Sequence, residues 1–421
     1  MDVQAVQRIR FQVVAATPTA AVGADSSASI ASFIDLPFRE GTAQMVLTRD
    51  ELDPMQAVQN IYEGRERVLG KRSATLSVTV NLSPTGTAAV TGTTAITSPI
   101  GRLLKAVMGG ENLAAGSTSA TSTAIVLKCA TASHCNRWAA GCVVGWSNGT
   151  FVEWRGVESV STSTSVTLKH AFSGTPAAGN IFYNAATYYM TADPDTTVDF
   201  LVEGLDSDDR FLLTGGQAVS GIGITFDLTG AAIPSVTFNF TFANWYASNE
   251  TGSSITGTLG TATYSATSPI VGEAGEFRSW TVGASTYVTT SRLHVSAVTW
   301  EPHLSYVPVT SPSGRNTIWR WKAARNSDSP VAGSFTIPYE DTTWFANRNS
   351  LADKNAMQVA GTAGGYAVIL DAPTIQILNP QRAADASGIA AQTLMWKGRR
   401  DTDVGSSTSE LAKSPFRIHL G

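Results

Sequence analysis

The chain contains long stretches in which apolar and polar residues alternate, and the first of them covers residues 73–82. Ala, Leu or Val occupies every second position there, and Ser, Thr and Asn fill the positions between. A period of two is typical of a strand with one buried and one solvated face. Further on, Ser98 and Pro99 precede an apolar series at helical spacing that ends at Gly109. This pattern predicts a helix with a serine N-cap and a glycine beyond its end.

The alternation returns in residues 221–242 as a predicted hairpin. Phe, Ile, Leu or Val stands at every second position of both arms, and Gly, Ser, Thr, Asn and Asp stand between them. Residues 229–234 supply the turn. Both predicted strands are therefore apolar on one face and small and polar on the other.

The length of the strand patterns and the spacing of glycines divide the chain into three regions. Short apolar segments separated by glycines predict a small inserted β module, whereas long strand patterns flank it on both sides. A strand pattern plus a short helix in each half indicates a duplicated unit. The predicted domains are a first β domain, the inserted β module and a second β region: 1–116 with 190–248, 117–189, and 249–421. Within the first domain, Asp50 is a candidate N-cap for a short helix over residues 51–62.

Composition favours an all-β protein whose surface is largely covered by partners. Charged residues make up only 15% of the 421 residues, while Gly, Ser and Thr abound. The formal net charge of -4 argues against a surface that grips nucleic acid, because such domains are strongly basic. The first residues lack the apolar core of a secretion signal, and no run approaches the roughly 18 apolar residues of a membrane helix. We therefore expect a soluble protein made in the cytoplasm.

Catalytic motifs are absent, so we expect a protein that is not an enzyme and needs no cofactor. The sequence has no phosphate-binding loop, no His-Glu-x-x-His and no Gly-x-Ser-x-Gly. Cys129, His134, Cys135 and Cys142 match no common zinc spacing, which favours buried thiols over a metal site. Residues 206–209 resemble half a calcium loop without its Gly and closing Glu, which favours an exposed turn. Ten tryptophans would suit a sugar-binding face, but several lie inside apolar strands, which favours packing in a core or a subunit interface.

Four segments carry a family resemblance. They are the alternating strand with the helix that follows it, the hairpin with Ile233-Pro234 before alternating phenylalanines, the closing strands, and a Pro-Ala-Ala-Gly-Asn turn before a Tyr-rich strand: 65–104, 213–240, 387–420 and 176–183. Together they resemble the tail tube protein, or major tail protein, of long-tailed bacteriophages (siphophages). The resemblance implies a β-sandwich or barrel with one small helix, similar to type VI secretion tube subunits.

The resemblance also implies a function and a set of partners. The protein would be a structural component of the virion tail, made in the host cytoplasm, that forms stacked rings around the conduit for DNA ejection. Its partners would be its own copies, the tape measure protein, the tail terminator, the distal tail or baseplate proteins, and genomic DNA that passes without specific binding. No membrane is implied. Two tube-like units in the chain would give a ring of three copies with sixfold-like symmetry, and a single decorated unit would give a ring of six.

Strands with one small polar face suit the wall of such a tube. Subunits that join edge to edge leave no strand edge unpaired, and the polar face then lines the channel. An ordinary solvated sheet face would show the same pattern. The predicted lumen residues are Ser73, Thr75, Ser77, Thr79, Asn81, Thr225, Asp227, Thr237, Asn239 and Thr241.

Other classes of β protein share parts of this pattern. A secreted or surface carbohydrate-binding or adhesin-like protein would account for the tryptophans and the abundance of Ser and Thr, and an outer-membrane barrel would account for the alternation. Both need an export signal, which the sequence does not show. A glycosidase is a further alternative, because its paired carboxylates meet only in the fold.

Overall fold

In the computed structural model of the chain, most of the described residues lie in antiparallel strands, which confirms the all-β class. The described strands form sheets of 18, six and two strands. In the part of the chain that the structure describes, no helix is both long and apolar enough to cross a bilayer. The described residues are 6, 8–15, 33–52, 68–84, 98–113, 115–161, 164–191, 196–204, 210–226, 232–248, 255, 269–271, 275–283, 292–310, 318–325, 330–338, 353–362, 365–384, 390–404 and 407–421.

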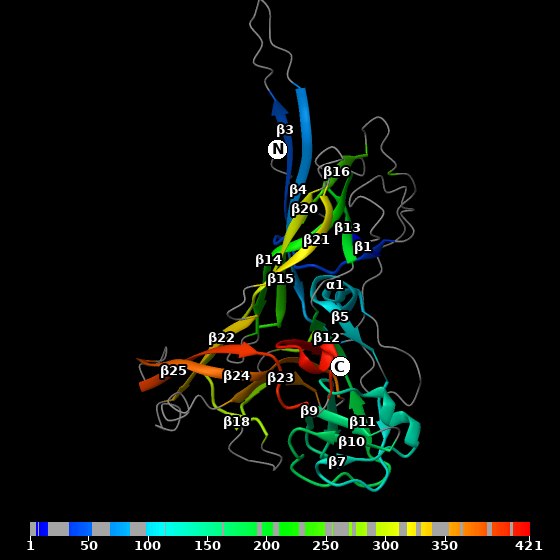
Figure 1. Cartoon of the computed structure of the whole chain (residues 1–421), viewed down its shortest axis with the longest axis vertical. Coiled ribbons are helices and arrows are strands. Elements are labelled where there is room, and N and C mark those ends of the chain that lie inside the picture. Colours follow the sequence, from blue (N-terminus) through cyan, green and yellow to red (C-terminus); the bar gives the residue numbers. More distant parts are fainter. Residues whose placement is uncertain are drawn as a thin grey trace, which may run out of the picture.

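A first unit is built around the predicted alternating strand, here β4 (Figure 1). In spatial order its strands are β3 (Gln44–Leu52), β4 (Val68–Asn81), β15 (Ser235–Phe242), β14 (Arg210–Thr225), β13 (Thr196–Glu203), β1 (Arg8–Ala15) and β2 (Ile34–Asp35). β16 (Asn244–Ala247) also pairs with β14. The predicted hairpin of residues 221–242 is confirmed by the pairing of β14 with β15.

A second unit repeats these pairings. In the same spatial order its strands are β19 (Ala297–Pro302), β22 (Val331–Pro338), β25 (Ala390–Arg399), β24 (Ala367–Ala384), β23 (Lys354–Gly361), β17 (Gly275–Arg278) and β18 (Arg292–Leu293). β26 (Arg417–Leu420) pairs with β24 as β16 pairs with β14. Each pairing of the first unit thus has an antiparallel counterpart in the second, and the two units are a structural repeat.

The predicted helix is confirmed as α1 (Pro99–Met108). The Ser98 hydroxyl accepts a hydrogen bond from the Gly101 N–H at 2.9 Å, and Gly109 ends the helix with a φ of 97°. Such a positive φ favours glycine, which has no Cβ to clash. Leu103, Leu104 and Val107 are fully buried in the core of the first unit. α1 leads directly into β5 (Gly109–Asn112), which pairs with β12 (Ala186–Met190).

A separate sheet of six strands lies between β5 and β12 in the sequence. In spatial order it consists of β6 (Ser117–Thr118), β11 (Ile181–Asn184), β8 (Val143–Ser147), β9 (Val152–Ser161), β10 (Ser165–Leu168) and β7 (Val126–Leu127), and η2 (Ala132–Arg137) packs against it. It has its own apolar cluster, and Trp154 and Tyr183 pack with Met357 and Ile369 of the second unit. The inserted module therefore interrupts the first unit in sequence but docks on the second unit in space.

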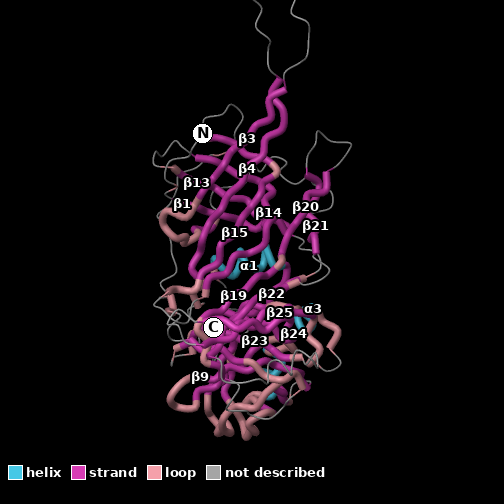
Figure 2. The backbone as a smooth tube through the Cα atoms, turned by 90° about the vertical axis from the view of Figure 1, so that its left-hand side faces the viewer, coloured by secondary structure: helices cyan, strands magenta, loops and turns pink. Residues whose placement is uncertain are grey.

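A hairpin of the second unit folds back over the first (Figure 2). It consists of β20 (Leu304–Thr310) and β21 (Ile318–Arg325) and forms the two-stranded sheet. The buried Trp321 donates its indole N–H to the Gly215 carbonyl at 3.0 Å, and the Tyr306 hydroxyl donates to the Val107 carbonyl. These contacts join the two units into one body with a shared core.

The predicted helix over residues 51–62 is wrong at its start. β3 continues through Leu52, because Glu51 and Leu52 pair with Leu69 and Val68 of β4. Cross-strand pairing of the long hairpin therefore overrides the local capping signal of Asp50. Residues 53–67 lie outside the described residues.

Candidate functional site

The predicted lumen residues lie together on one face of the first unit. Thr79 is paired with Thr237, and Ser77 is paired with Asn239, across β4 and β15. Paired residues of antiparallel strands share a face, and so does every second residue along a strand. The residues brought together in this way are Ser73, Thr75, Ser77, Thr79, Asn81, Thr225, Thr237, Asn239 and Thr241. Asp227 lies outside the described residues, and the role of this polar face as a channel lining stays a prediction.

The opposite face of the same strands is packed into the core. Val78 and Phe238 are 0% exposed and Phe240 is 1% exposed, which confirms their predicted inward direction. On the polar face, the hydroxyls of Thr79 and Thr237 form a hydrogen bond of 2.9 Å. A slip of one residue would turn the phenylalanines into solvent, so burial determines which residues form the polar face.

The second unit has an equivalent polar face, whose residues are not among the predicted lumen residues. Exposure alternates along β22, where Ser334 and Thr336 are half-buried. The hydroxyls of Thr336 and Thr393 lie 2.9 Å apart, as do those of Thr299 and Ser334. The first contact repeats the threonine pair of β4 and β15. Apolar and polar residues also alternate in residues 331–338, which could have predicted this face. Ala and Gly at the second and third positions weaken that pattern.

The two polar faces are joined edge to edge. Ile224 of β14 is paired with Trp300 of β19, so Thr225 and Thr299 continue the same face from one unit to the next. Gln358 of β23, which is 0% exposed, holds this joint from beneath. It accepts from the Trp300 indole at 2.5 Å and donates to the Phe226 carbonyl at 2.8 Å. The result is one polar face that runs over eight strands.

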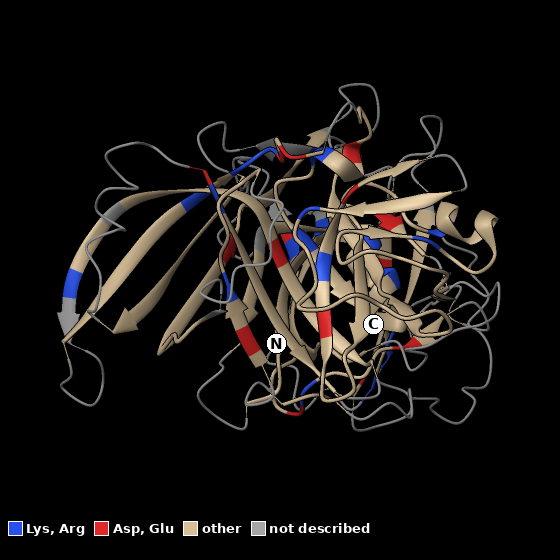
Figure 3. Cartoon of the chain, turned by 90° about the horizontal axis from the view of Figure 1, so that it is seen from below, with Lys and Arg blue, Asp and Glu red and all other residues tan. Residues whose placement is uncertain are grey.

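Few charged side chains occur along this face. Hydroxyls and amides predominate, together with the exposed apolar side chains of Val46 and Met395. Glu301 and Lys397 are exposed and lie on either side of Ala332, which pairs with both. Seen from below, the long strands that reach furthest from the body are mostly uncharged (Figure 3). Lys397 and Arg399, which follow each other on the exposed face of β25, add positive charges that the alternating runs of the first unit did not predict, and Arg399 is paired with Asp353.

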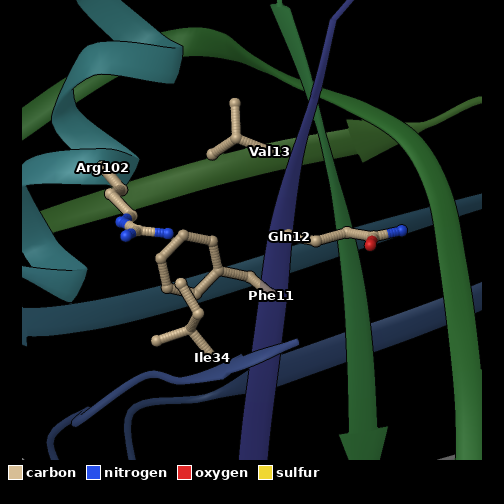
Figure 4. Close-up of a pocket in the computed structure, with 5 residues that line it drawn as sticks. All are labelled: Phe11, Gln12, Val13, Ile34 and Arg102. Carbon is tan, nitrogen blue, oxygen red and sulfur yellow. The ribbon is translucent and has the colours of Figure 1, made fainter. Parts of the chain in front are cut away.

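A small depression between β1 and α1 has no catalytic arrangement of groups. It encloses about 150 Å³ and is lined by Phe11, Gln12, Val13, Ile34 and Arg102. The Arg102 side chain lies beside Phe11 and Ile34, whereas Gln12 points to the other side of β1 (Figure 4). The Gln12 amide donates to Asp199 at 3.1 Å. Polar groups therefore do not converge on this depression as they do in a ligand site.

The cysteines of the inserted module are buried free thiols. Burial, reinforced by the neighbouring Cys135, raises the pKa of Cys129 to about 12. A thiol must lose its proton to bind a metal, so this environment opposes metal binding. The His134 ring instead bonds the Ser117 hydroxyl at 3.1 Å. Within the described ranges, no three His, Cys, Asp or Glu side chains are placed to hold a metal ion. Residues 206–209, the other metal candidate, lie outside those ranges.

Most of the tryptophans pack in cores. Seven of them are less than 9% exposed: Trp138, Trp146, Trp154, Trp280, Trp300, Trp321 and Trp396. Trp245 is half-buried, with the Arg72 guanidinium 4.9 Å from its ring centre. These side chains do not form an exposed aromatic platform.

A buried cluster of charges, which we call the clamp, ties the inserted module to the second unit. It consists of Lys169, Asp371, Asp401 and Arg417, whose side chains are at most 7% exposed. Asp401 binds Lys169 at 2.5 Å and Arg417 at 2.8 Å, and Asp371 binds Arg417 at 3.0 Å. Arg417 also donates to the Ala412 carbonyl, at the end of the short helix α3 (Glu410–Lys413), at 2.9 Å. Two cations thus balance two carboxylates, which is the structural use of buried charge.

His419 borders this clamp. Burial lowers the pKa of His419, and its Nδ1 lies 2.9 Å from the Thr187 hydroxyl. Burial alone would raise the pKa of Asp371, but its neighbours outweigh burial and lower that pKa. The Arg417 charge is the neighbour that the geometry supports, because the His419 ring is 4.0 Å from Asp371, beyond hydrogen-bond reach. His419 is therefore a neutral ring beside a balanced set of charges.

Comparison with known proteins leaves the polar face as the main guide to function. No family model matches the chain, and no curated protein is similar to it.

Proposed function

We propose that this protein is the tail tube subunit of a long-tailed bacteriophage, whose stacked rings form the conduit for DNA. The observation that carries the proposal is the continuous polar face over two repeated units, β3–β4–β15–β14 and β19–β22–β25–β24. A sheet of this kind, buried on one side and small and polar on the other, suits the wall of a water-filled channel.

The chemistry of the face suits passage of DNA without binding. A DNA-binding surface neutralises phosphates with Lys and Arg, and its affinity falls as salt releases counterions. Thr, Ser and Asn dominate this face instead. The exposed Lys397 is accompanied by Glu301 two strands away, and the exposed Arg399 is paired with Asp353. A duplex inside such a channel meets hydroxyls and amides and little net charge, so it stays mobile.

The repeat favours a ring of three copies. Each copy supplies two equivalent sheets, so three copies supply six around the axis, with sixfold-like symmetry. A ring built in this way joins strand edges that would otherwise remain open to aggregation. The inserted module docks on the second unit and not on the polar face, which suits a position outside the channel. Tape measure, terminator and distal tail or baseplate proteins are the partners that this role requires.

Electron microscopy of the purified protein tests the proposal. We expect rings with a central channel, or stacked tubes at higher protein concentration, and mass photometry should give three chains per ring. A protein that stays a single chain at every concentration, and that immunogold labelling does not find on phage tails, would contradict the proposed function.

A further inference from the structure

The two units of one chain meet at an internal joint between two strands. β14 is the last strand of the polar face in the first unit, and β19 is the first strand of the polar face in the second unit. They meet antiparallel at Ile224 and Trp300. The pairing of β14 with β13 ends at Gly216, and β14 contacts β19 further along, at Ile224.

The chain presents the two halves of this joint again at its outer edges. By the repeat, β24 corresponds to β14 and β3 corresponds to β19. Among the described strands, β3 pairs with β4 alone, and β24 beyond Gln376 pairs with β25 alone. Within the described part of the chain, the last strand of the second unit's polar face and the first strand of the first unit's polar face are therefore edge strands.

The threonine pairs of the two units give the register. Thr79 with Thr237 corresponds to Thr336 with Thr393, since both pairs bond at 2.9 Å on the polar face. Counting along the ladders from these pairs, Ile224 corresponds to Arg382. By the same count Trp300 corresponds to Met45.

We infer, building on the proposed tube function, that β24 of one copy pairs antiparallel with β3 of the next, with Arg382 opposite Met45 and Gln381 opposite Val46. On the β3 side the side chains fit this register, whereas Arg382, which is exposed, stands where Ile224 packs against the core of the internal joint. Met45 is 5% exposed and Trp300 is 3% exposed, so β3 and β19, which correspond in the repeat, both turn a large apolar residue into the core at this position. Gln381 and Val46 both lie on the exposed polar face, and Val46 is 57% exposed in the single copy.

The contact is short and runs head to tail. Pro380 has no N–H to donate, so pairing between the two copies adds few hydrogen bonds before Gln381. The internal joint is equally short, with one pair of residues. Different strands of each copy take part, which makes the interface heterologous and lets it close into a ring. Val46 would be covered by the neighbouring copy. The polar face would then continue from Gln381 of one copy to Val46 of the next and on to Thr75, which pairs with Val46.

Paired cysteines test the register. Directly opposed residues of antiparallel strands have Cβ atoms about 5 Å apart, whereas diagonal neighbours are roughly 7 to 8 Å apart, and only the direct pair suits a disulfide. The test variant carries Val46→Cys and Gln381→Cys. The matched control carries Thr48→Cys and Gln381→Cys, because Thr48 is exposed on the same face of β3 two residues further on. The three native cysteines are buried, so background cross-linking is low.

After mild oxidation of assembled rings, we expect the test variant to shift from one-chain to two- and three-chain bands on non-reducing gels, reversed by dithiothreitol. The control should remain mostly as single chains. Mixing the two single variants should give a two-chain product that neither gives alone, which marks a head-to-tail contact. Rings that form normally without this cross-link, or that cross-link equally in the control, would overturn the inferred joint. If the unsubstituted protein forms no rings and immunogold labelling does not find it on phage tails, the proposed function itself is refuted.

Discussion

Removing one charge from the clamp should destabilise the protein strongly. Asp401→Asn keeps the size of the side chain and the Oδ1 atom that accepts from the Asp403 N–H at 3.0 Å. It leaves Lys169 and Arg417 with Asp371 as their single carboxylate partner in the clamp. Breaking a buried pair by removing one partner costs about 3–5 kcal/mol, because the remaining charge is buried without compensation.

A second substitution should restore the charge balance of the clamp. Lys169→Met alone leaves two carboxylates around Arg417 and should cost a similar amount. Lys169→Met with Asp401→Asn leaves one cation, Arg417, with one anion, Asp371, at 3.0 Å. Because residues of one ion-pair network do not act additively, the double variant should lose less stability than either single variant.

Urea unfolding followed by tryptophan fluorescence measures these losses, since Trp154 and Trp280 are buried where the inserted module meets the second unit. Lys105→Met is the control, because its pair with Glu111 is partly exposed, with side chains 41% and 22% accessible. Exposed pairs contribute about 0 to 1 kcal/mol. Additive losses in the double variant, or single losses no larger than that of the control, would refute the role of balanced charge in the clamp.

Three further predictions concern the core, acid sensitivity and the polar face. Phe240→Ala should cost about 3–5 kcal/mol in urea unfolding because the ring is buried, and a loss below about 1 kcal/mol would contradict that packing. The free energy of unfolding should fall as the pH drops below about 6.5, because His419 takes up a proton in the unfolded chain but not when it is buried. His419→Asn should reduce the slope of this free energy against pH by at most about 1.4 kcal/mol per pH unit. Equal slopes in the two proteins would exclude His419 as the cause. Thr75→Lys should leave folding intact and slow DNA release from particles in a way that high salt relieves, unlike Phe151→Lys on the inserted module; normal release in low salt would mean that Thr75 does not face the DNA path.

Local sequence patterns determined the elements on which the proposal rests. The strict alternation around Val78 and Phe238 specified which side of each strand is buried, because a period of two leaves only one way to hide the large residues. The helix α1 was equally well marked, because Ser98 and Gly109 satisfy its ends through short-range hydrogen bonds and backbone freedom. Where the local capping signal and strand pairing conflicted, as at Asp50, pairing with the next strand of the hairpin decided the outcome.

Only the tertiary structure decided how those elements combine. The pairing of Ile224 with Trp300, which turns two polar faces into one, joins residues that no periodicity relates. The docking of the inserted module on the second unit likewise depends on Lys169 and Asp401, which are 232 positions apart and which local propensity cannot bring together. Sequence periodicity reports which face of a strand is buried, whereas the partner that buries it is selected by packing and charge balance over the whole chain.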